Sequence, residues 1–175
     1  MYDSVQISSQ ILMDQKSKAI VLSSFPDKRY FRLLYRGSEC GYAAEAFHKR
    51  CDNRGPTLTI CKSEYGKIFG LYTDIPWEST QNRQVRLNRN TFKFTMGVHR
   101  LEKFYVKPGC IEVVHTPKNI VTAVNFSIKD QCNLTVENQA KISQNDDCAA
   151  GLSEDDRANY LAGAPSFRVI EIEVF

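Results

Sequence analysis

The chain has 175 residues, of which 42% are hydrophobic and 25% charged, and these ordinary proportions exclude a disordered or fibrous protein. The net charge of +3 and the pI of about 8.5 are too modest to indicate nucleic acid as a partner. The sequence has no apolar run long enough for a membrane span and no secretory signal at its start, so we expect one soluble cytoplasmic domain without membrane insertion.

The first predicted elements are a capped turn and a helix. Residues 1–8 are expected to form a lead-in, after which Ser9 can cap a turn that presents Ile11 and Leu12 to the core. Residues 15–24 favour a helix, which the following Phe-Pro pair ends because proline restricts the residue before it.

The densest run of predicted elements follows. Alternating residues predict a strand over 31–36, and strong helix formers predict a helix over 42–51. Pro56 cannot continue that helix, and the β-rich runs 57–62 and 67–73 are joined by a short loop of the hairpin type. We expect the helix to present one side made of Ala43, Ala46, Phe47 and Arg50.

The next part of the chain begins with a polar loop over residues 78–90. Alternation and β-rich composition then predict strands over 91–96, 103–107 and 110–115. The β-branched run 120–128 is typical of one long strand that is covered on both faces.

The C-terminal part changes character twice. Residues 132–161 lack apolar periodicity and predict an irregular surface excursion, with a helical turn near 153–158. Residues 167–175 alternate apolar and polar side chains in their second half and predict a closing strand.

These elements predict an α+β, β-rich fold, namely an antiparallel two-sheet β-sandwich with two or three short peripheral helices. We expect a single domain over residues 9–175. The aromatic and aliphatic residues predicted to be largely buried are Phe31, Leu33, Phe47, Phe69, Tyr72, Trp77, Phe92 and Phe94.

The order and spacing of short motifs resemble a known family. The motifs between residues 31 and 77 are Leu33-Leu34-Tyr35-Arg36, Gly41-Tyr42, Phe47-His48, Cys51-Asp52, Thr57-Leu58, Phe69-Gly70, Tyr72 and Pro76-Trp77. With Ser9 to Leu12, the tetrad Tyr160 to Gly163 and the ending Phe167 to Phe175, they resemble the TLDc domain of the oxidation-resistance proteins. The resemblance implies two face-to-face sheets, protection against oxidative stress and, for several members, binding to the vacuolar proton pump (V-ATPase).

Arg83, Arg86 and Arg89 are the best candidates for a partner-binding surface. They lie three residues apart in a polar segment, for which a solvated loop is the first interpretation, a protein partner the second and nucleic acid the third. The acidic stretch from Asp146 to Asp156 is a second surface candidate, of opposite sign.

Glu171 and Glu173 are two residues apart on the closing strand and are expected on one face of it. Paired carboxylates can perform acid–base chemistry, but on an edge strand they more often form a solvated face that prevents edge pairing. We keep both as candidate partner-binding residues.

The sequence has six cysteines, and without a secretory signal we expect all of them reduced. Cys51 is the candidate redox thiol, because His48, Lys49 and Arg50 precede it and can lower its pKa. A buried structural role is the alternative. No second ligand cluster accompanies His48 and Cys51, so we predict no metal and no cofactor.

No catalytic residue is assigned, because the sequence lacks the nucleotide-binding, hydrolase and metalloprotease motifs. The leading hypothesis is a non-enzymatic TLDc protein-interaction module whose partner is a protein or a multi-subunit complex such as the V-ATPase. One alternative is a structural subunit built into a larger assembly. The other is a thiol-based peroxide-reactive protein that uses Cys51.

Overall fold

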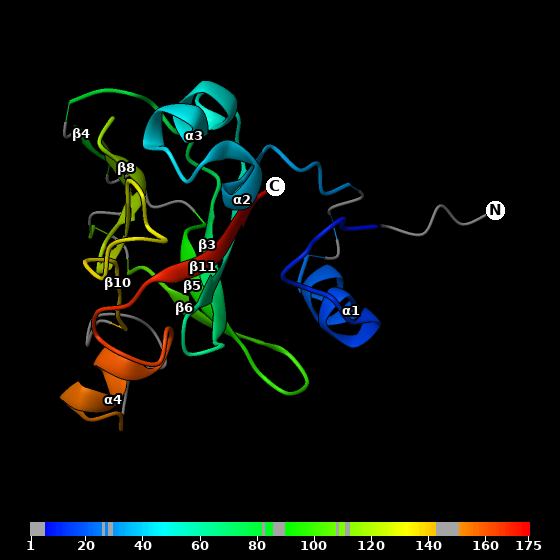
Figure 1. Ribbon diagram of the computed structural model, residues 1–175. Helices are drawn as coiled ribbons and strands as arrows, with labels where there is room; N and C mark the ends of the chain where they lie inside the picture. The colour runs from blue at the N-terminus through cyan, green and yellow to red at the C-terminus, as the bar shows by residue number, and fades with distance from the viewer. Residues whose placement is uncertain are drawn as a thin grey trace.

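Two antiparallel β-sheets packed face to face make up most of the computed structural model (Figure 1). The model describes residues 6–25, 27, 30–81, 83–85, 90–107, 109–110, 113–142 and 151–175. In spatial order the six-stranded sheet contains β1 (Tyr35–Arg36), β11 (Val169–Val174), β2 (Thr57–Ser63), β3 (Ile68–Thr73), β5 (Phe92–Met96) and β6 (Leu101–Tyr105). The five-stranded sheet contains β10 (Gln139–Ala140), β9 (Phe126–Lys129), β8 (Asn119–Ala123), β7 (Val113–His115) and β4 (Arg83–Val85).

The described helices lie at the periphery of the sheets (Figure 1). They are α1 (Gln15–Ser23), α2 (Gly37–Cys40), α3 (Ala44–Cys51) and α4 (Glu154–Asn159). The predicted β-rich sandwich with short helices is therefore confirmed. No described helix has the length and apolar character to span a membrane.

The six-stranded sheet is covered on both faces. Its inner face packs against the five-stranded sheet and α3 through residues such as Phe69, Leu71 and Ile172. Its outer face packs against the N-terminal segment and α1 through residues such as Ile60 and Phe94. This double cover explains why β2 is buried along almost its whole length.

The N-terminal segment forms the predicted turn. The Ser9 hydroxyl accepts hydrogen bonds from the backbone N–H groups of Ile11 at 3.1 Å and Leu12 at 2.9 Å. Both side chains are buried in the outer layer, and α1 follows with Asp14 as its N-cap. Satisfying the free N–H groups of the turn allows this short segment to cover the sheet.

The β2–β3 hairpin is present as predicted, and one of its glycines permits close packing of the backbone. A Cβ atom at Gly70 would lie 2.0 Å from the carbonyl oxygen of Thr59 and would also meet the Phe94 ring. A side chain at this position would therefore force the two strands apart.

Helix α3 exists, and of the four residues expected on one side of it only Phe47 is buried. The buried residues are Ala44, Phe47, His48 and Cys51. Phe47 packs edge-on against Tyr35 and Trp77, with ring centroids 5.7 and 5.8 Å apart. The helix also contacts β8, and this second contact buries His48, whose Nε2 lies near the carbonyl oxygen of Asn119.

Three predicted segments differ from the structure. The predicted long strand over 120–128 is wrong: Val124 and Asn125 form a turn between β8 and β9, with Asn125 at φ 53°, a conformation that asparagine tolerates. The predicted loop over 78–90 contains strand β4. The predicted strand over 31–36 is a strand only at Tyr35–Arg36, with a separate isolated bridge between Phe31 and Ile7.

The predicted core is confirmed for five residues and only partly for the other three. Phe47, Phe69, Trp77, Phe92 and Phe94 are buried. The three that are half-buried, all against the outer layer, are Phe31, Leu33 and Tyr72. The thinner N-terminal cover leaves these side chains partly exposed.

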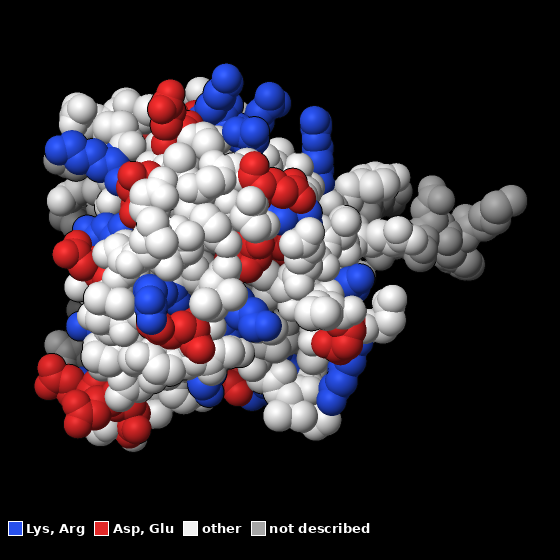
Figure 2. All heavy atoms as spheres, in the orientation of Figure 1, with Lys and Arg blue, Asp and Glu red and all other residues white. Residues whose placement is uncertain are grey.

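The irregular C-terminal excursion contains the predicted helical turn as α4. Ser153 caps it in a reciprocal arrangement with Asp156, and Glu154, Asp155 and Asp156 are exposed in its first turn. Figure 2 shows these acidic side chains gathered at one corner of the molecule, over α4 in Figure 1.

Phe47→Ala should lower the free energy of unfolding by about 3–5 kcal/mol, because it leaves a cavity among Tyr35, Trp77 and α3. Chemical denaturation monitored by circular dichroism measures the change. Tyr30→Ala removes an aromatic side chain that is 79% exposed and should alter stability by no more than about 0.5 kcal/mol. Equal effects of the two substitutions would contradict the placement of Phe47.

Candidate functional site

Arg83, the first residue of the predicted arginine surface, opens strand β4 at an edge of the five-stranded sheet. Its side chain is 55% exposed and donates from Nη2 to Oε1 of Glu78 at 3.0 Å. Arg86 and Arg89 lie outside the described residues. A binding role for the three arginines stays a prediction.

The interpretation of Glu173 as part of a solvated edge face is wrong. Strand β11 lies between β1 and β2, and the Glu173 side chain is fully buried. One carboxylate oxygen accepts from Nε of Arg36 at 2.9 Å and from the backbone N–H of Gln10 at 2.8 Å. The other accepts from the hydroxyl of Ser9. The carboxylate therefore joins the C-terminal strand to β1 and to the N-terminal segment.

Arg36 completes this buried network. Its Nη1 also donates to Glu39 at 2.6 Å. Burial acts to lower the pKa of Arg36, but the hydrogen bonds to Glu39 and Glu173 outweigh it, and the pKa is raised. Glu171 is half-buried and accepts from the backbone N–H of Ser38 at 3.1 Å, so both predicted carboxylates are engaged within the fold. A binding role for Glu171 stays a prediction, whereas Glu173 has no exposed side chain to offer.

Cys51 is fully buried at the end of α3. Burial, with a smaller effect of the adjacent Asp52, raises the pKa of its thiol to about 12. A reactive thiol needs exposure and a lowered pKa, and Cys51 has neither in this structure. The described cysteines are all unpaired. Among the described residues, no group of three or more His, Cys, Asp or Glu side chains is placed to hold a metal ion.

His48 does not pair with Cys51 but belongs to a polar cluster that the sequence did not reveal. Its Nδ1 lies 2.8 Å from Oδ1 of Asp52, and its Nε2 lies 3.0 Å from the carbonyl oxygen of Asn119. The other oxygen of Asp52 accepts from the hydroxyl of Ser79. Because Ser79 contacts the carboxylate and not the imidazole, this arrangement does not activate a serine nucleophile.

His115 lies on β7 in the same region. Its Nδ1 accepts from the backbone N–H of Glu78 at 3.2 Å, which places the ring hydrogen on Nε2. Burial lowers the pKa of His115 and favours the neutral ring. Together the two histidines attach α3 and the segment after Trp77 to the five-stranded sheet.

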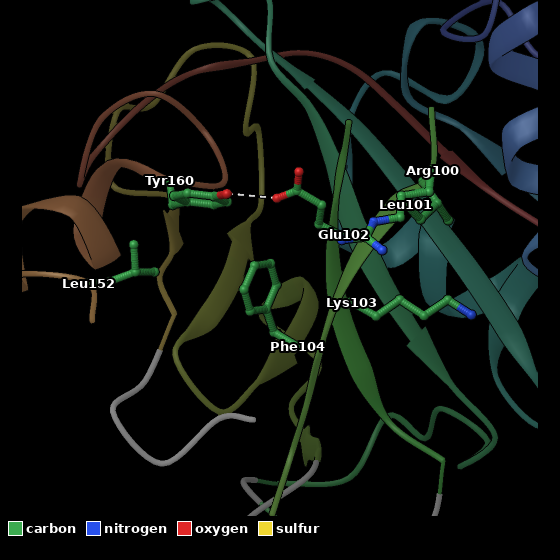
Figure 3. Close-up of a pocket in the computed structure, with 7 residues that line it drawn as sticks. All are labelled: Arg100, Leu101, Glu102, Lys103, Phe104, Leu152 and Tyr160. Carbon is green, nitrogen blue, oxygen red and sulfur yellow. Dashed lines mark hydrogen bonds between the residues drawn. The ribbon is translucent and has the colours of Figure 1, made fainter. Parts of the chain in front are cut away.

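A hollow lies beside β6, the strand at one edge of the six-stranded sheet (Figure 3). Its volume is about 410 Å³, and Leu152 and Tyr160 face Glu102 and Phe104 across it. The Tyr160 hydroxyl donates to Oε2 of Glu102 at 2.7 Å, and this bond raises the pKa of Tyr160. The Tyr160 ring packs edge-on against Phe104, with centroids 5.7 Å apart.

The opposite face of β6 borders a second, aromatic hollow. It has a volume of about 310 Å³, and its lining includes Phe25, Tyr72, Phe92 and Tyr105. The Lys103 ammonium lies over the Phe25 and Phe92 rings, 5.2 and 4.8 Å from their centroids. It also donates to the carbonyl oxygen of Ser24 at 2.9 Å, and burial lowers its pKa. An edge strand with a hollow on each face is therefore a candidate binding site.

Comparison with protein families identifies the fold. A model of the TLDc domain matches residues 6–175, which include both sheets and both ends of the described structure. The chain belongs to the TLDc domain family. No curated protein matches the sequence.

In this TLDc domain, the motifs that carry the family resemblance hold the fold together. Arg36 binds Glu173, Phe47 packs against Trp77, and Gly70 permits close strand packing. The Trp77 indole also donates to the hydroxyl of Thr57 at 3.0 Å. Strand β6 lies outside residues 31–77, which explains why these motifs did not point to it.

Glu173→Gln should destabilise this TLDc domain by about 3 kcal/mol, because it removes the charge that compensates the buried Arg36. Urea unfolding measures the loss, and hydrogen exchange should show faster opening of Ile11 and Leu12. Glu171→Gln is the matched control and should cost about 1 kcal/mol or less, since its amide oxygen still accepts a hydrogen bond. If both substitutions lower the free energy of unfolding by the same amount, the Arg36–Glu173 ion pair is not desolvated.

Thiol reactivity should divide the cysteines by burial. In the folded protein at pH 8, Cys51, Cys61 and Cys132 should react slowly with an aromatic disulfide reagent, because burial raises their pKa values and blocks access. Unfolded, unreduced protein should give all six thiols of the sequence. Fewer than six would reveal a disulfide, and rapid labelling of folded Cys51 would contradict its burial.

Proposed function

We propose that this TLDc domain is a non-enzymatic protein-interaction module. The observation that supports it is the edge strand β6, which has hollows of about 410 and 310 Å³ on its two faces. An unpaired strand edge can form main-chain hydrogen bonds with another chain, and neighbouring hollows can accept side chains.

The environment of Cys51, the candidate nucleophile, also supports a binding role rather than a catalytic one. A catalytic thiol must be accessible and lie within hydrogen-bond reach of a base. Cys51 is buried, and both ring nitrogens of the nearby His48 are engaged by Asp52 and Asn119. Peroxide chemistry at Cys51 would therefore require the domain to open first.

The resemblance to the oxidation-resistance proteins supports a finer proposal. We infer that the partner is the V-ATPase and that the cellular role is protection against oxidative stress. The exposed Arg83 side chain, with Arg86 and Arg89 close in sequence, offers positive charge for an acidic surface of such a complex.

Replacing Arg83, Arg86 and Arg89 by Glu should weaken capture of purified V-ATPase by the immobilised domain. The loss should be greatest at low salt, where charges act over about 30 Å rather than the 8 Å of physiological salt. A control triple replacement of Lys16 and Lys18 on α1 and of the exposed Arg32 should bind as the wild type does.

Cys51→Ser should leave capture unchanged. No capture of the V-ATPase by the wild-type domain would refute the finer proposal. Loss of peroxide protection in cells on Cys51→Ser, with the arginine variant still protective, would refute the interaction module and establish the thiol hypothesis.

A further inference from the structure

Strand β6 has one edge that no described strand occupies. The flanking backbone bonds, Gly97 to Arg100 at 3.0 Å and Val106 to Thr91 at 3.1 Å, fix the alternation of the antiparallel ladder. Glu102 and Phe104 therefore direct their backbone groups toward β5. Leu101, Lys103 and Tyr105 direct theirs to the open edge.

The two faces of β6 carry different chemistry. Glu102 and Phe104 border the hollow with Leu152 and Tyr160, and Lys103 and Tyr105 border the aromatic hollow. Side chains of a strand added at this edge alternate between the same two faces. A single extended segment can thus fill both hollows at once.

Glu102 defines what the segment must carry. Its carboxylate is half-buried and accepts from the neutral hydroxyl of Tyr160, and no ion pair to it is formed by the described residues. Asp156 of the acidic first turn of α4 borders a separate hollow that shares Glu102 and Tyr160 and is also lined by Lys67. The missing counter-charge favours a basic side chain opposite Glu102.

The remaining positions follow from the register. Phe104 and Leu152 favour an apolar side chain opposite Phe104, and the aromatic hollow, which Tyr105 also borders, favours an aromatic one opposite Lys103. Because each described strand pairing in the sheet is antiparallel, the added segment is taken to run opposite to β6. Its order is then apolar, aromatic, basic.

We propose that β6 binds an extended segment of a partner protein by antiparallel strand addition, with an apolar–aromatic–basic tripeptide opposite Phe104, Lys103 and Glu102. This rests on the proposed interaction function and names the kind of segment that the site recognises.

A central edge lysine often protects a strand from such pairing, but Lys103 is not placed to do so. Its ammonium lies over the rings of Phe25 and Phe92 and bonds to Ser24, away from the open edge. A second copy of the chain is also a poorer occupant. Antiparallel pairing of two β6 strands about Lys103 would place the lysines opposite each other and leave Glu102 opposite Phe104.

The test uses the full chain and a fluorescent seven-residue peptide, Thr-Ser-Val-Tyr-Arg-Ser-Thr. Saturable binding in fluorescence anisotropy is expected. Glu102→Gln should weaken binding of this peptide about tenfold, because a charged contact is lost. A control peptide in which Gln replaces Arg should bind the wild-type domain more weakly, and Glu102→Gln should leave its affinity unchanged. Absence of saturable binding up to about 1 mM overturns the proposal.

Two further comparisons isolate the backbone contact. Lys103→Pro and Lys103→Ala both remove the side chain, but only proline removes the N–H that faces the open edge. Binding should be lost with proline and retained with alanine, after thermal melts show that both variants are folded. With the wild-type domain, N-methylation of the central Tyr of the peptide should abolish binding, whereas N-methylation of the adjacent Arg should not. If the two methylated peptides bind the wild-type domain equally well, strand addition is overturned, and this comparison needs no variant of the domain.

Measuring V-ATPase capture and peptide binding together distinguishes failure of the β6 site from failure of the proposed interaction module. If Lys103→Pro still captures the V-ATPase and the peptide does not bind, the interaction module stands and the β6 site fails. Concentration-dependent dimerisation that is lost in Lys103→Pro would identify a second copy as the occupant and overturn the proposal.

Discussion

The six-stranded sheet depends on the last strand of the chain lying between β1 and β2, held there by the buried Arg36–Glu173 pair. Such a pair costs desolvation energy and is stable only when its remaining hydrogen-bonding groups are satisfied. The Ser9 hydroxyl and the Gln10 N–H supply those bonds. Both ends of the chain must therefore be in place before the sheet and its outer layer are complete, and much of the fold rests on contacts between residues more than 130 positions apart.

Among the described strands, the two edges of the six-stranded sheet differ in length. At one end of the six-stranded sheet, β1 is only two residues long and α2 follows it directly. At the other end, β6 spans five residues beside the excursion that contains Leu152 and Tyr160. The described part of the excursion contacts β6 through the Tyr160 side chain, which donates to Glu102 and packs against Phe104, and a hollow lies between them.

Sequence patterns predicted what depends on local periodicity and capping: the sandwich class, α1, the β2–β3 hairpin and α4. They failed where a distant neighbour decides the outcome. Glu173 follows the pattern of a solvated edge residue, and only the placement of β11 between two strands makes it buried. The β8–β9 turn depends on Asn125 adopting a positive φ inside a run of strand-forming residues. The hollow between Glu102 and Tyr160 was missed because the two residues are 58 positions apart in sequence, and no local pattern joins them.

The two sheets end in edges of different chemistry. Strand β4 is an edge of the five-stranded sheet and begins with the exposed Arg83, whereas β6 is an edge of the other sheet and lies near the acidic first turn of α4. We have proposed an acidic surface as the partner of the first edge and a basic segment as the partner of the second. Since the edges belong to different sheets, occupation of one does not require the hydrogen-bonding groups of the other. A domain of this kind can contact two parts of one assembly at the same time, and two weak contacts held on one rigid body bind more tightly than either alone.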